Sequence, residues 1–306
     1  GGNGDAPGAP EDPDVAMPAA HGNGGEAGGN GVAPGAPATP TCGREFLDKQ
    51  ARYFRELLTL HRHGLSLFDA FQLGRTWSRG ACVHLQRALP LPMHWAEEVD
   101  AGVEDFVCEL LQVTHLPREQ LFLKVNEGGF GFGSAAARGP GALLASWEGD
   151  ICATAQTLGE KTAAGLRRRW PGLARALTDA EANQGHLAGR TPLQGRWQGL
   201  LGGRVGTTQK TYTSQVRANQ AKSFLTELAR EPAAAVYGAS GPSAGAWLEI
   251  HEGVSPLADQ AFRIAAKRRM DLPLLPGPCG CQNRGTGTAT RDKCGREVDV
   301  QGGHAL

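Results

Sequence analysis

One segment decides the fold class, and it reads Trp95-Ala-Glu-Glu-Val-Asp-Ala-Gly-Val-Glu-Asp-Phe-Val-Cys-Glu-Leu-Leu111. Its large apolar side chains recur every three or four residues, the spacing that places them on one face of an α-helix. Paired acidic residues fall on the polar face. A helix with this pattern has to bury its apolar face against other elements. The segment therefore predicts a long helix, closed before Pro117, inside a helical protein.

The same spacing recurs on both sides of this segment. Before it, apolar residues repeat at helical intervals over 46–61 and 65–85, and Gly64 and Pro90 follow as stop signals. Further helices are predicted over 162–177, 208–230 and 259–270. Sustained alternating runs rich in Val, Ile and Tyr, which indicate strands, do not occur. The sequence thus predicts a mainly α fold.

A glycine cluster precedes one further predicted helix. The run Gly128-Gly-Phe-Gly-Phe-Gly133 predicts a turn or a pair of very short extended pieces, because glycine adopts backbone conformations outside helices. Ser134 is suited to cap the helix that follows toward Leu158. We expect Gly139-Pro140-Gly141 to interrupt the start of this helix.

The N-terminal segment differs from the rest in composition. Residues 1–40 contain five acidic side chains, no Lys or Arg, 11 of the 44 glycines and 7 of the 19 prolines. Such a segment buries too little apolar surface to offset the entropy lost on ordering, so residues 1–42 are predicted to be a disordered low-complexity tail. The remainder carries 31 basic against 26 acidic side chains, a net charge of +5.

Several classes of protein are excluded by composition. No apolar run approaches the ~18–20 residues that cross a bilayer, so no membrane partner is expected. No secretory leader pattern and no Asn-x-Ser/Thr acceptor occur. Seven cysteines, an odd number at low density, predict reduced thiols and hence a nuclear or cytoplasmic protein. Because the chain begins with Gly-Gly rather than Met, we expect a fragment.

A Cys/His cluster near the C-terminus is a candidate zinc site, formed by Cys279, Cys281, Cys294 and His304. Zinc takes four nitrogen or sulfur ligands in a tetrahedron, and a Cys-x-Cys turn supplies two of them from one loop. The spacing Cys-x-Cys-x12-Cys-x9-His contains a single close pair. The alternative, unliganded thiols in a Gly- and Thr-rich tail, therefore stays open.

Two glycine-containing motifs invite other interpretations. Gly241-x-Ser243-x-Gly245 fits the nucleophile elbow of a serine hydrolase, and acidic residues and then His304 follow in hydrolase order. That elbow needs a preceding parallel sheet, which the helical pattern opposes. Residues 202–210 are glycine-rich and end in Lys210, but they lack the register of a phosphate-binding loop, so a turn is favoured.

Basic side chains concentrate in two clusters near predicted helix ends. These are Arg167, Arg168 and Arg169, followed by Trp170, and Lys267, Arg268 and Arg269. Cationic side chains neutralise phosphates, and a neighbouring indole can stack on a base. Alternatively, such charges form the solvated face of a helix end and complement its dipole. Both interpretations stay open for each cluster.

Several motifs form an ordered series along the chain. They are Trp77-Ser-Arg-Gly-Ala-Cys-Val-His-Leu-Gln-Arg-Ala-Leu-Pro90, residues 95–111, Gly128-Gly-Phe-Gly-Phe-Gly-Ser134, Ala142-Leu-Leu-Ala-Ser-Trp147, Ser240-Gly-Pro-Ser-Ala-Gly-Ala-Trp247, Asp259-Gln-Ala-Phe-Arg-Ile264 with Arg268-Arg269, and Asp299-Val-Gln-Gly-Gly-His-Ala-Leu306. This series resembles the region after the polymerase palm in reverse transcriptases of non-LTR retroelements. The resemblance covers roughly residues 65–306, with a poorly matched middle at about 178–232.

The resemblance implies a thumb-like helical domain over residues 43–160, a helical region with long loops over 161–278, and a zinc knuckle over 279–306. Gly303 stands where the family has Asp, and the sequence ends at Leu306, before the family's next Cys, so the implied knuckle is truncated. The family's palm holds two metal ions on adjacent aspartates. Because this sequence has no Asp-Asp pair, the resemblance implies a fragment of an RNA-directed DNA polymerase that does not itself polymerise.

The resemblance and the positive charge after residue 40 together predict template or primer binding. The partner is RNA or DNA, the two basic clusters are the candidate phosphate contacts, and no small-molecule substrate is expected. A net charge of +5 is mild. The alternative is therefore a degenerate structural or protein-interaction fragment without a nucleic-acid role.

The zinc prediction is tested by metal content. We expect about one zinc ion per chain by mass spectrometry of the purified protein, because four nitrogen and sulfur ligands complete a structural site. The double variant Cys279→Ser, Cys281→Ser should lose it, since two thiolates are removed. Wild-type protein without zinc would show that these residues do not close a site.

Overall fold

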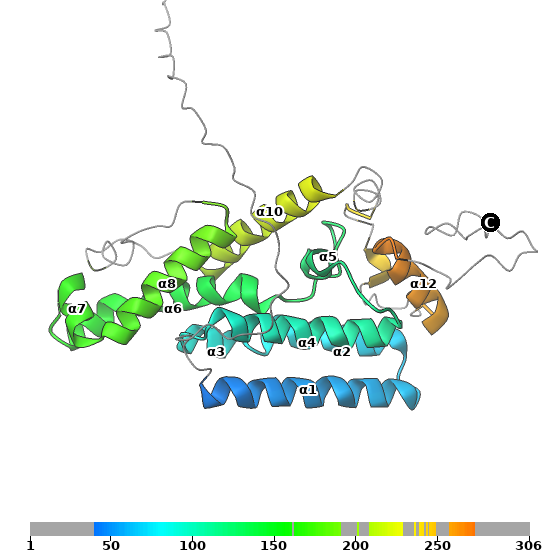
Figure 1. The fold of residues 1–306 in the computed structure, drawn as a ribbon, viewed down its shortest axis with the longest axis horizontal. Coiled ribbons are helices and arrows are strands. Elements are labelled where there is room, and N and C mark those ends of the chain that lie inside the picture. The colour runs from blue at the N-terminus through cyan, green and yellow to red at the C-terminus, as the bar shows by residue number, and fades with distance from the viewer. Residues whose placement is uncertain are drawn as a thin grey trace, which may run out of the picture. The chain divides into compact units, whose positions relative to one another are not determined.

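The structure, a computed structural model, describes residues 40–160, 162–190, 201, 208–228, 236, 239–241, 243, 245–248 and 257–272. Helices account for most of these residues, and their β structure is one isolated bridge between Glu127 and Ser240. The predicted mainly α fold is therefore confirmed (Figure 1). None of the helices within these ranges combines the length and the apolarity that crossing a membrane requires.

The helices follow one another with short connections over the first half of the chain. In order they are α1 (Thr41–Arg62), α2 (Leu67–Gly80), α3 (Val83–Ala88), α4 (Met93–Leu111), α5 (Arg118–Phe122), α6 (Ala135–Thr157), α7 (Ala163–Arg169), α8 (Pro171–Leu187), α10 (Gln209–Glu227) and α12 (Asp259–Arg269), with a 3-10 turn, η1, at Ala246–Leu248.

Most predicted helices are confirmed, and their bounds differ by a few residues. The helix predicted over 162–177 is two helices, because Pro171 starts α8 after an extended Trp170. Thr41 and Cys42, which were predicted to belong to the disordered tail, are instead the first residues of α1, and residues 1–39 lie outside the described part.

The segment Trp95 to Leu111 forms most of α4 and lies in the largest hydrophobic core. Val103, Phe106 and Leu110 of this helix are buried, and α1, α2 and α6 pack around it. The Phe106 ring stacks on Phe54 of α1 with the ring centroids 4.5 Å apart. A Cβ atom at Gly74 would lie 2.3 Å from Phe106, so this glycine lets α2 approach α4 closely.

The glycine cluster after α5 is a turn that inserts two aromatic rings into this core. Phe130 and Phe132 are both 0% exposed, and both meet the Phe71 ring edge-on. Gly131 has a φ angle of +70°, and a Cβ atom at Gly129 would lie 2.3 Å from the Leu123 carbonyl oxygen. Glycine at these positions therefore allows a turn too tight for other residues.

The last described helix, α12, packs into the same hydrophobic core as α1, α2 and α4, although it lies much later in the sequence. Phe262 packs edge-on against Phe71, and the Asp259 carboxylate accepts a hydrogen bond of 2.8 Å from the backbone nitrogen of Leu67. These partners are 192 residues apart, and Asp259 thereby helps to cap α2.

The two predicted helical regions are therefore joined. The core that contains α2 and α4 also contains α12, and α6 packs against both α8 and α10. The predicted boundary at residue 160 does not separate two cores. In the region where the resemblance is poorly matched, α8 continues to Leu187 and residue 201 is helical, whereas residues 191–200 and 202–206 lie outside the described part.

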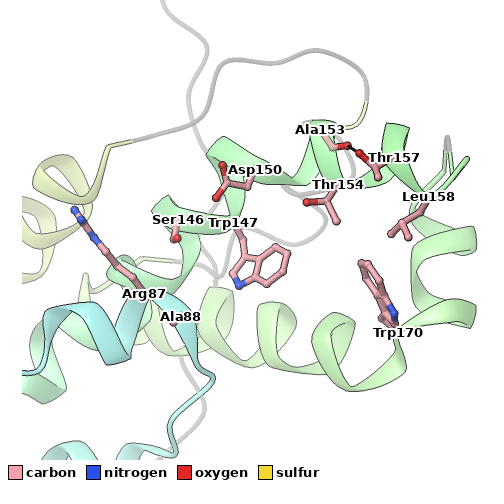
Figure 2. A pocket seen from close by; sticks show the side chains of 10 residues that line it. All are labelled: Arg87, Ala88, Ser146, Trp147, Asp150, Ala153, Thr154, Thr157, Leu158 and Trp170. Carbon is pink, nitrogen blue, oxygen red and sulfur yellow. Dashed lines mark hydrogen bonds between the residues drawn. The ribbon is translucent and has the colours of Figure 1, made fainter.

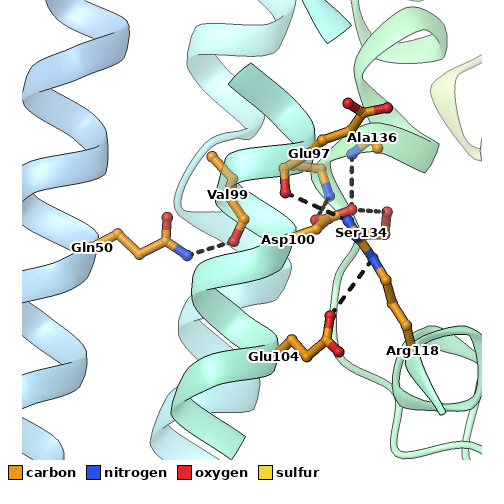
Figure 3. Close-up of polar contacts among 9 residues, drawn as sticks. Gln50, Glu97, Val99, Asp100, Glu104, Arg118, Ser134 and Ala136 are labelled. Atoms are coloured by element: carbon orange, nitrogen blue, oxygen red, sulfur yellow. Dashed lines mark hydrogen bonds and ion pairs between the residues drawn. The ribbon is translucent and has the colours of Figure 1, made fainter. Parts of the chain in front are cut away.

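Asp100 of α4 fixes the start of α6 (Figure 3). Its carboxylate accepts hydrogen bonds of 2.6 Å from the backbone nitrogen of Ala135, 2.6 Å from the Ser134 hydroxyl and 3.3 Å from the backbone nitrogen of Ala136. Ser134 in turn accepts from the backbone nitrogen of Ala137, so it caps α6 as predicted. Burial raises the pKa of Asp100, although these hydrogen bonds oppose the rise.

The predicted interruption at Gly139-Pro140-Gly141 is wrong, because α6 continues through this motif. Pro140 lacks the N–H group that would bond to the Ala136 carbonyl, but it is buried within α6. A Cβ atom at Gly141 would lie 2.6 Å from Cβ of Tyr212 in α10. Gly141 therefore allows α10 to pack closely against α6, and the motif does not break the helix.

Asp100→Ala is expected to lower the free energy of unfolding by about 3 kcal/mol, because three donors at the start of α6 lose their acceptor. Urea denaturation followed by circular dichroism measures the change. Asp105→Ala, which removes an exposed acid from the same helix, should change the same quantity by less than about 0.5 kcal/mol. Equal losses in the two variants would contradict a capping role for Asp100.

Candidate nucleic-acid interface

An open groove lies between α10 and the end of α8, and we call it the α8–α10 groove. Its volume is about 640 Å³. The residues that line it are Ala188, Gly189, Arg190, Lys210, Thr211, Ser214, Gln215, Ala218, Asn219 and Lys222. Three of them are cationic and exposed, and none is acidic. The groove is therefore an electropositive surface with amide and hydroxyl groups between the charges.

Two hydrogen bonds join α8 to α10 next to this groove. The Gln184 side chain donates to the Tyr212 carbonyl and the Asn219 side chain donates to the Leu187 carbonyl, each at 3.1 Å. Gly189 has a φ angle of +62°, and a Cβ atom there would lie 2.5 Å from the Asn219 side-chain oxygen. The chain therefore turns directly against α10 at Asn219 after α8 ends.

Helix geometry sets the length of the charged surface. Lys210 lies in the first turn of α10, where Thr208 accepts a hydrogen bond of 3.3 Å from the Thr211 backbone nitrogen. The partial positive charge of a helix N-terminus adds to the charge of Lys210. Along α10, Lys210 and Lys222 are separated by about 18 Å. This distance corresponds to roughly five base steps of a nucleic-acid strand.

A third cation of α10, Arg217, lies among other guanidinium groups. Burial lowers the pKa of Arg217, and the charges of Arg138 and Arg79 lower it further, while Glu127 opposes them. Arg138 donates a hydrogen bond of 3.0 Å to the Ser134 carbonyl. Guanidinium groups from α2, α6 and α10 therefore share one region and raise its positive potential.

The first predicted basic cluster occupies the last turn of α7. It consists of Arg167, Arg168 and Arg169, all exposed. Arg169 donates a hydrogen bond of 3.3 Å to the Leu158 carbonyl at the end of α6. The position suits a phosphate contact and equally complements the helix dipole, so both sequence interpretations are compatible with it.

The second predicted cluster, Lys267, Arg268 and Arg269, occupies the last turn of α12. Arg269 was predicted to contact phosphate, but its side chain is buried, with only 6% of the residue exposed. Its side chain donates a hydrogen bond of 3.1 Å to the Gly129 carbonyl and lies 5.9 Å from the Phe130 ring centroid. Burial lowers its pKa to about 10, so it remains a cation at neutral pH. Arg269 therefore anchors α12 to the glycine turn, whereas Arg268 is exposed.

Other predicted sites are only partly covered by the structure. The candidate zinc ligands Cys279, Cys281, Cys294 and His304 lie outside the described residues. Within the described ranges no three His, Cys, Asp or Glu side chains are grouped as a metal site needs. Ser243 lies in an irregular segment, and the part of the chain that the structure describes contains no parallel sheet to support a nucleophile elbow.

Comparisons of this chain with protein-family models, with curated proteins and with solved structures found no match. The resemblance to reverse transcriptases therefore rests on the ordered motifs of the sequence.

Sequence reasoning did not single out the α8–α10 groove. Lys210 was considered only as the end of a glycine-rich loop, and Arg190 and Lys222 stand alone in the sequence. A usable signal was nevertheless present. Lys210, Ser214, Ala218 and Lys222 follow at intervals of four residues, which defines a ridge that winds slowly around the helix and has basic ends and no acid.

Arg269→Gln is expected to lower the free energy of unfolding by about 2 kcal/mol, because the glycine turn loses a charged hydrogen-bond donor. Arg268→Gln removes the same charge from the exposed neighbour, and its effect should stay below about 0.5 kcal/mol. The free energies of unfolding of the two variants are compared by thermal and urea denaturation. Equal stability of the two proteins would contradict the anchoring role of Arg269.

Proposed function

We propose that this chain binds template or primer nucleic acid through the phosphate backbone, as the C-terminal part of a non-LTR retroelement RNA-directed DNA polymerase. The α8–α10 groove carries the proposal, because Arg190, Lys210 and Lys222 line it without any carboxylate. Lys and Arg neutralise phosphates and release counterions, which is the main source of affinity in sequence-independent binding.

The polar residues between the charges support the same function. Thr211, Ser214, Gln215 and Asn219 also line the groove. Hydroxyl and amide groups hydrogen-bond to phosphate and sugar oxygens, and such contacts position a nucleic acid without reading its sequence. The proposed role is therefore to hold and orient a strand.

The exposed basic residues of α7 and α12 extend this proposal. Arg167, Arg168 and Arg169 at the end of α7, and Arg268 at the end of α12, are further candidate phosphate contacts. Polymerisation is not part of the proposed function, because the sequence contains no adjacent aspartates to hold two metal ions.

The triple variant Arg190→Gln, Lys210→Gln, Lys222→Gln tests the groove. Fluorescence anisotropy with an RNA–DNA hybrid duplex over a series of salt concentrations gives the slope of log affinity against log salt. We expect the variant to bind more than about tenfold more weakly at moderate salt, and the slope to become shallower by about 3, because each lost phosphate contact contributes about 0.9.

A control variant distinguishes the effect of losing the groove residues from the effect of lowering the net charge. Lys49→Gln, Arg52→Gln, Arg55→Gln removes the same charge from exposed positions of α1, and its affinity should stay close to that of the wild type. Equal weakening in both triple variants would contradict the groove as the interface. Wild-type protein that binds no hybrid at low salt would favour the structural or protein-interaction alternative.

The same titration tests the predicted α7 cluster. Neutralising Arg167, Arg168 and Arg169 together should weaken binding and flatten the salt dependence, because these side chains are exposed at a helix end. An unchanged slope would remove this cluster from the interface and leave the groove as the contact surface.

A further inference from the structure

A second hollow lies beside the end of α7, and phosphate binding in the α8–α10 groove does not account for it. Its volume is about 640 Å³, and the indole rings of Trp147 and Trp170 form part of its wall. Figure 2 shows Trp147 projecting into this space from α6 and Trp170 from the junction of α7 and α8. We call this site the tryptophan hollow.

The two indoles are held in place but not covered. Both are half-buried and pack against the hydrophobic cluster that joins α6, α7 and α8, which includes Ile151 and Leu166. One part of each ring is therefore fixed by packing, while the rings also line the hollow. Rigid aromatic rings of this kind are stacking platforms for other planar rings.

One cation and one carboxylate line the hollow, and a second cation is bonded to the backbone of a lining residue. Arg87 of α3 lines the hollow and donates a hydrogen bond of 2.9 Å to the Gln209 side chain. Arg169 is bonded to the carbonyl of Leu158, whose side chain lines the hollow. Asp150 contributes a carboxylate to the wall.

This arrangement constrains the chemistry of the ligand. A phosphate is favoured near Arg87 and Arg169 and disfavoured inside, where it would meet the Asp150 carboxylate. A neutral planar ring with donor groups suits the inside, because it can stack on an indole and donate to a carboxylate. A nucleotide carries both parts, a ring and a separate phosphate.

We propose that the tryptophan hollow binds an unpaired base of a single-stranded nucleic acid, stacked on Trp147 or Trp170, with the neighbouring phosphates at Arg87 and Arg169. The inference rests on the proposed nucleic-acid-binding function and makes it more specific. Bases within a duplex are already stacked on one another, so the hollow selects the unpaired part of a template.

The experiment compares three probes with the full chain in one anisotropy assay. The probes are a short single-stranded oligonucleotide, an abasic oligonucleotide of the same length and charge, and a blunt duplex. The wild type should bind the base-containing strand about tenfold more tightly than the abasic strand, because stacking of one base on an aromatic ring has this magnitude. Equal affinity for the two strands would overturn the inference.

Variants assign this preference to the hollow. Trp147→Ala and Trp170→Ala should each reduce the advantage of the base-containing strand severalfold without changing duplex binding, whereas Trp147→Phe and Trp170→Phe should retain most of it. Loss of base preference in the Phe variants as well, with unfolding excluded by circular dichroism, would contradict stacking as its cause. If an Ala variant fails to fold, the affinities of the wild type for the base-containing and the abasic strand still test whether a base is bound.

The two proposals fail in different ways. Wild-type protein that binds the duplex but does not distinguish the base-containing strand from the abasic one would leave the proposed function intact and exclude base stacking. That result is also expected if the hollow takes an aromatic side chain of a protein partner. Wild-type protein that binds none of the three probes would end both proposals.

Discussion

The carboxylate of Asp100 determines where α6 begins, and much of the molecule is arranged around α6. This helix packs against α3, α4, α8 and α10. Burying a carboxylate is costly unless hydrogen-bond donors surround it, and here the hydroxyl of Ser134 and the backbone nitrogens of Ala135 and Ala136 do so. Because these donors belong to the first turn of α6, the same contacts set both the position and the direction of the helix.

Neighbouring residues of α6 serve the two candidate binding surfaces. Trp147 forms part of the wall of the tryptophan hollow, and the next residue, Glu148, accepts a hydrogen bond from the hydroxyl of Tyr212 in α10. Tyr212 is buried, and Gly141, about two turns before Glu148 in α6, gives it room. One helix therefore carries both a wall of the tryptophan hollow and the support of the α8–α10 groove, and sites built on helices hold a ligand more precisely than sites on loops.

Much of the local structure could be predicted from the sequence, and most of the long-range structure could not. Helices α1, α4, α10 and α12 follow from spacing and stop signals, and the cap at Ser134 follows from its residue type. By contrast, the role of Gly141 depends on the approach of another helix. Arg269 appeared with Arg268 as one basic cluster, but burial against the glycine turn separates their roles. The periodicity of α12 does carry this signal, because Arg269 follows Phe262 and Ala266 at the i, i+4, i+7 spacing of the buried face. Grouping the cations by charge alone does not use it.

The cap that Asp259 provides for α2 has a consequence for the order of events during synthesis. Its partner Leu67 leaves the ribosome 192 residues earlier, an interval of about 10–40 s at ordinary translation rates. During that time Phe71 lacks its contact with Phe262, and the apolar surface between α2 and the glycine turn is open to water. The early helices can form quickly because their contacts are local, but their shared core closes only after the end of α12 has emerged. The nascent chain therefore passes through a prolonged stage in which chaperones have access to aromatic surface that the finished protein buries.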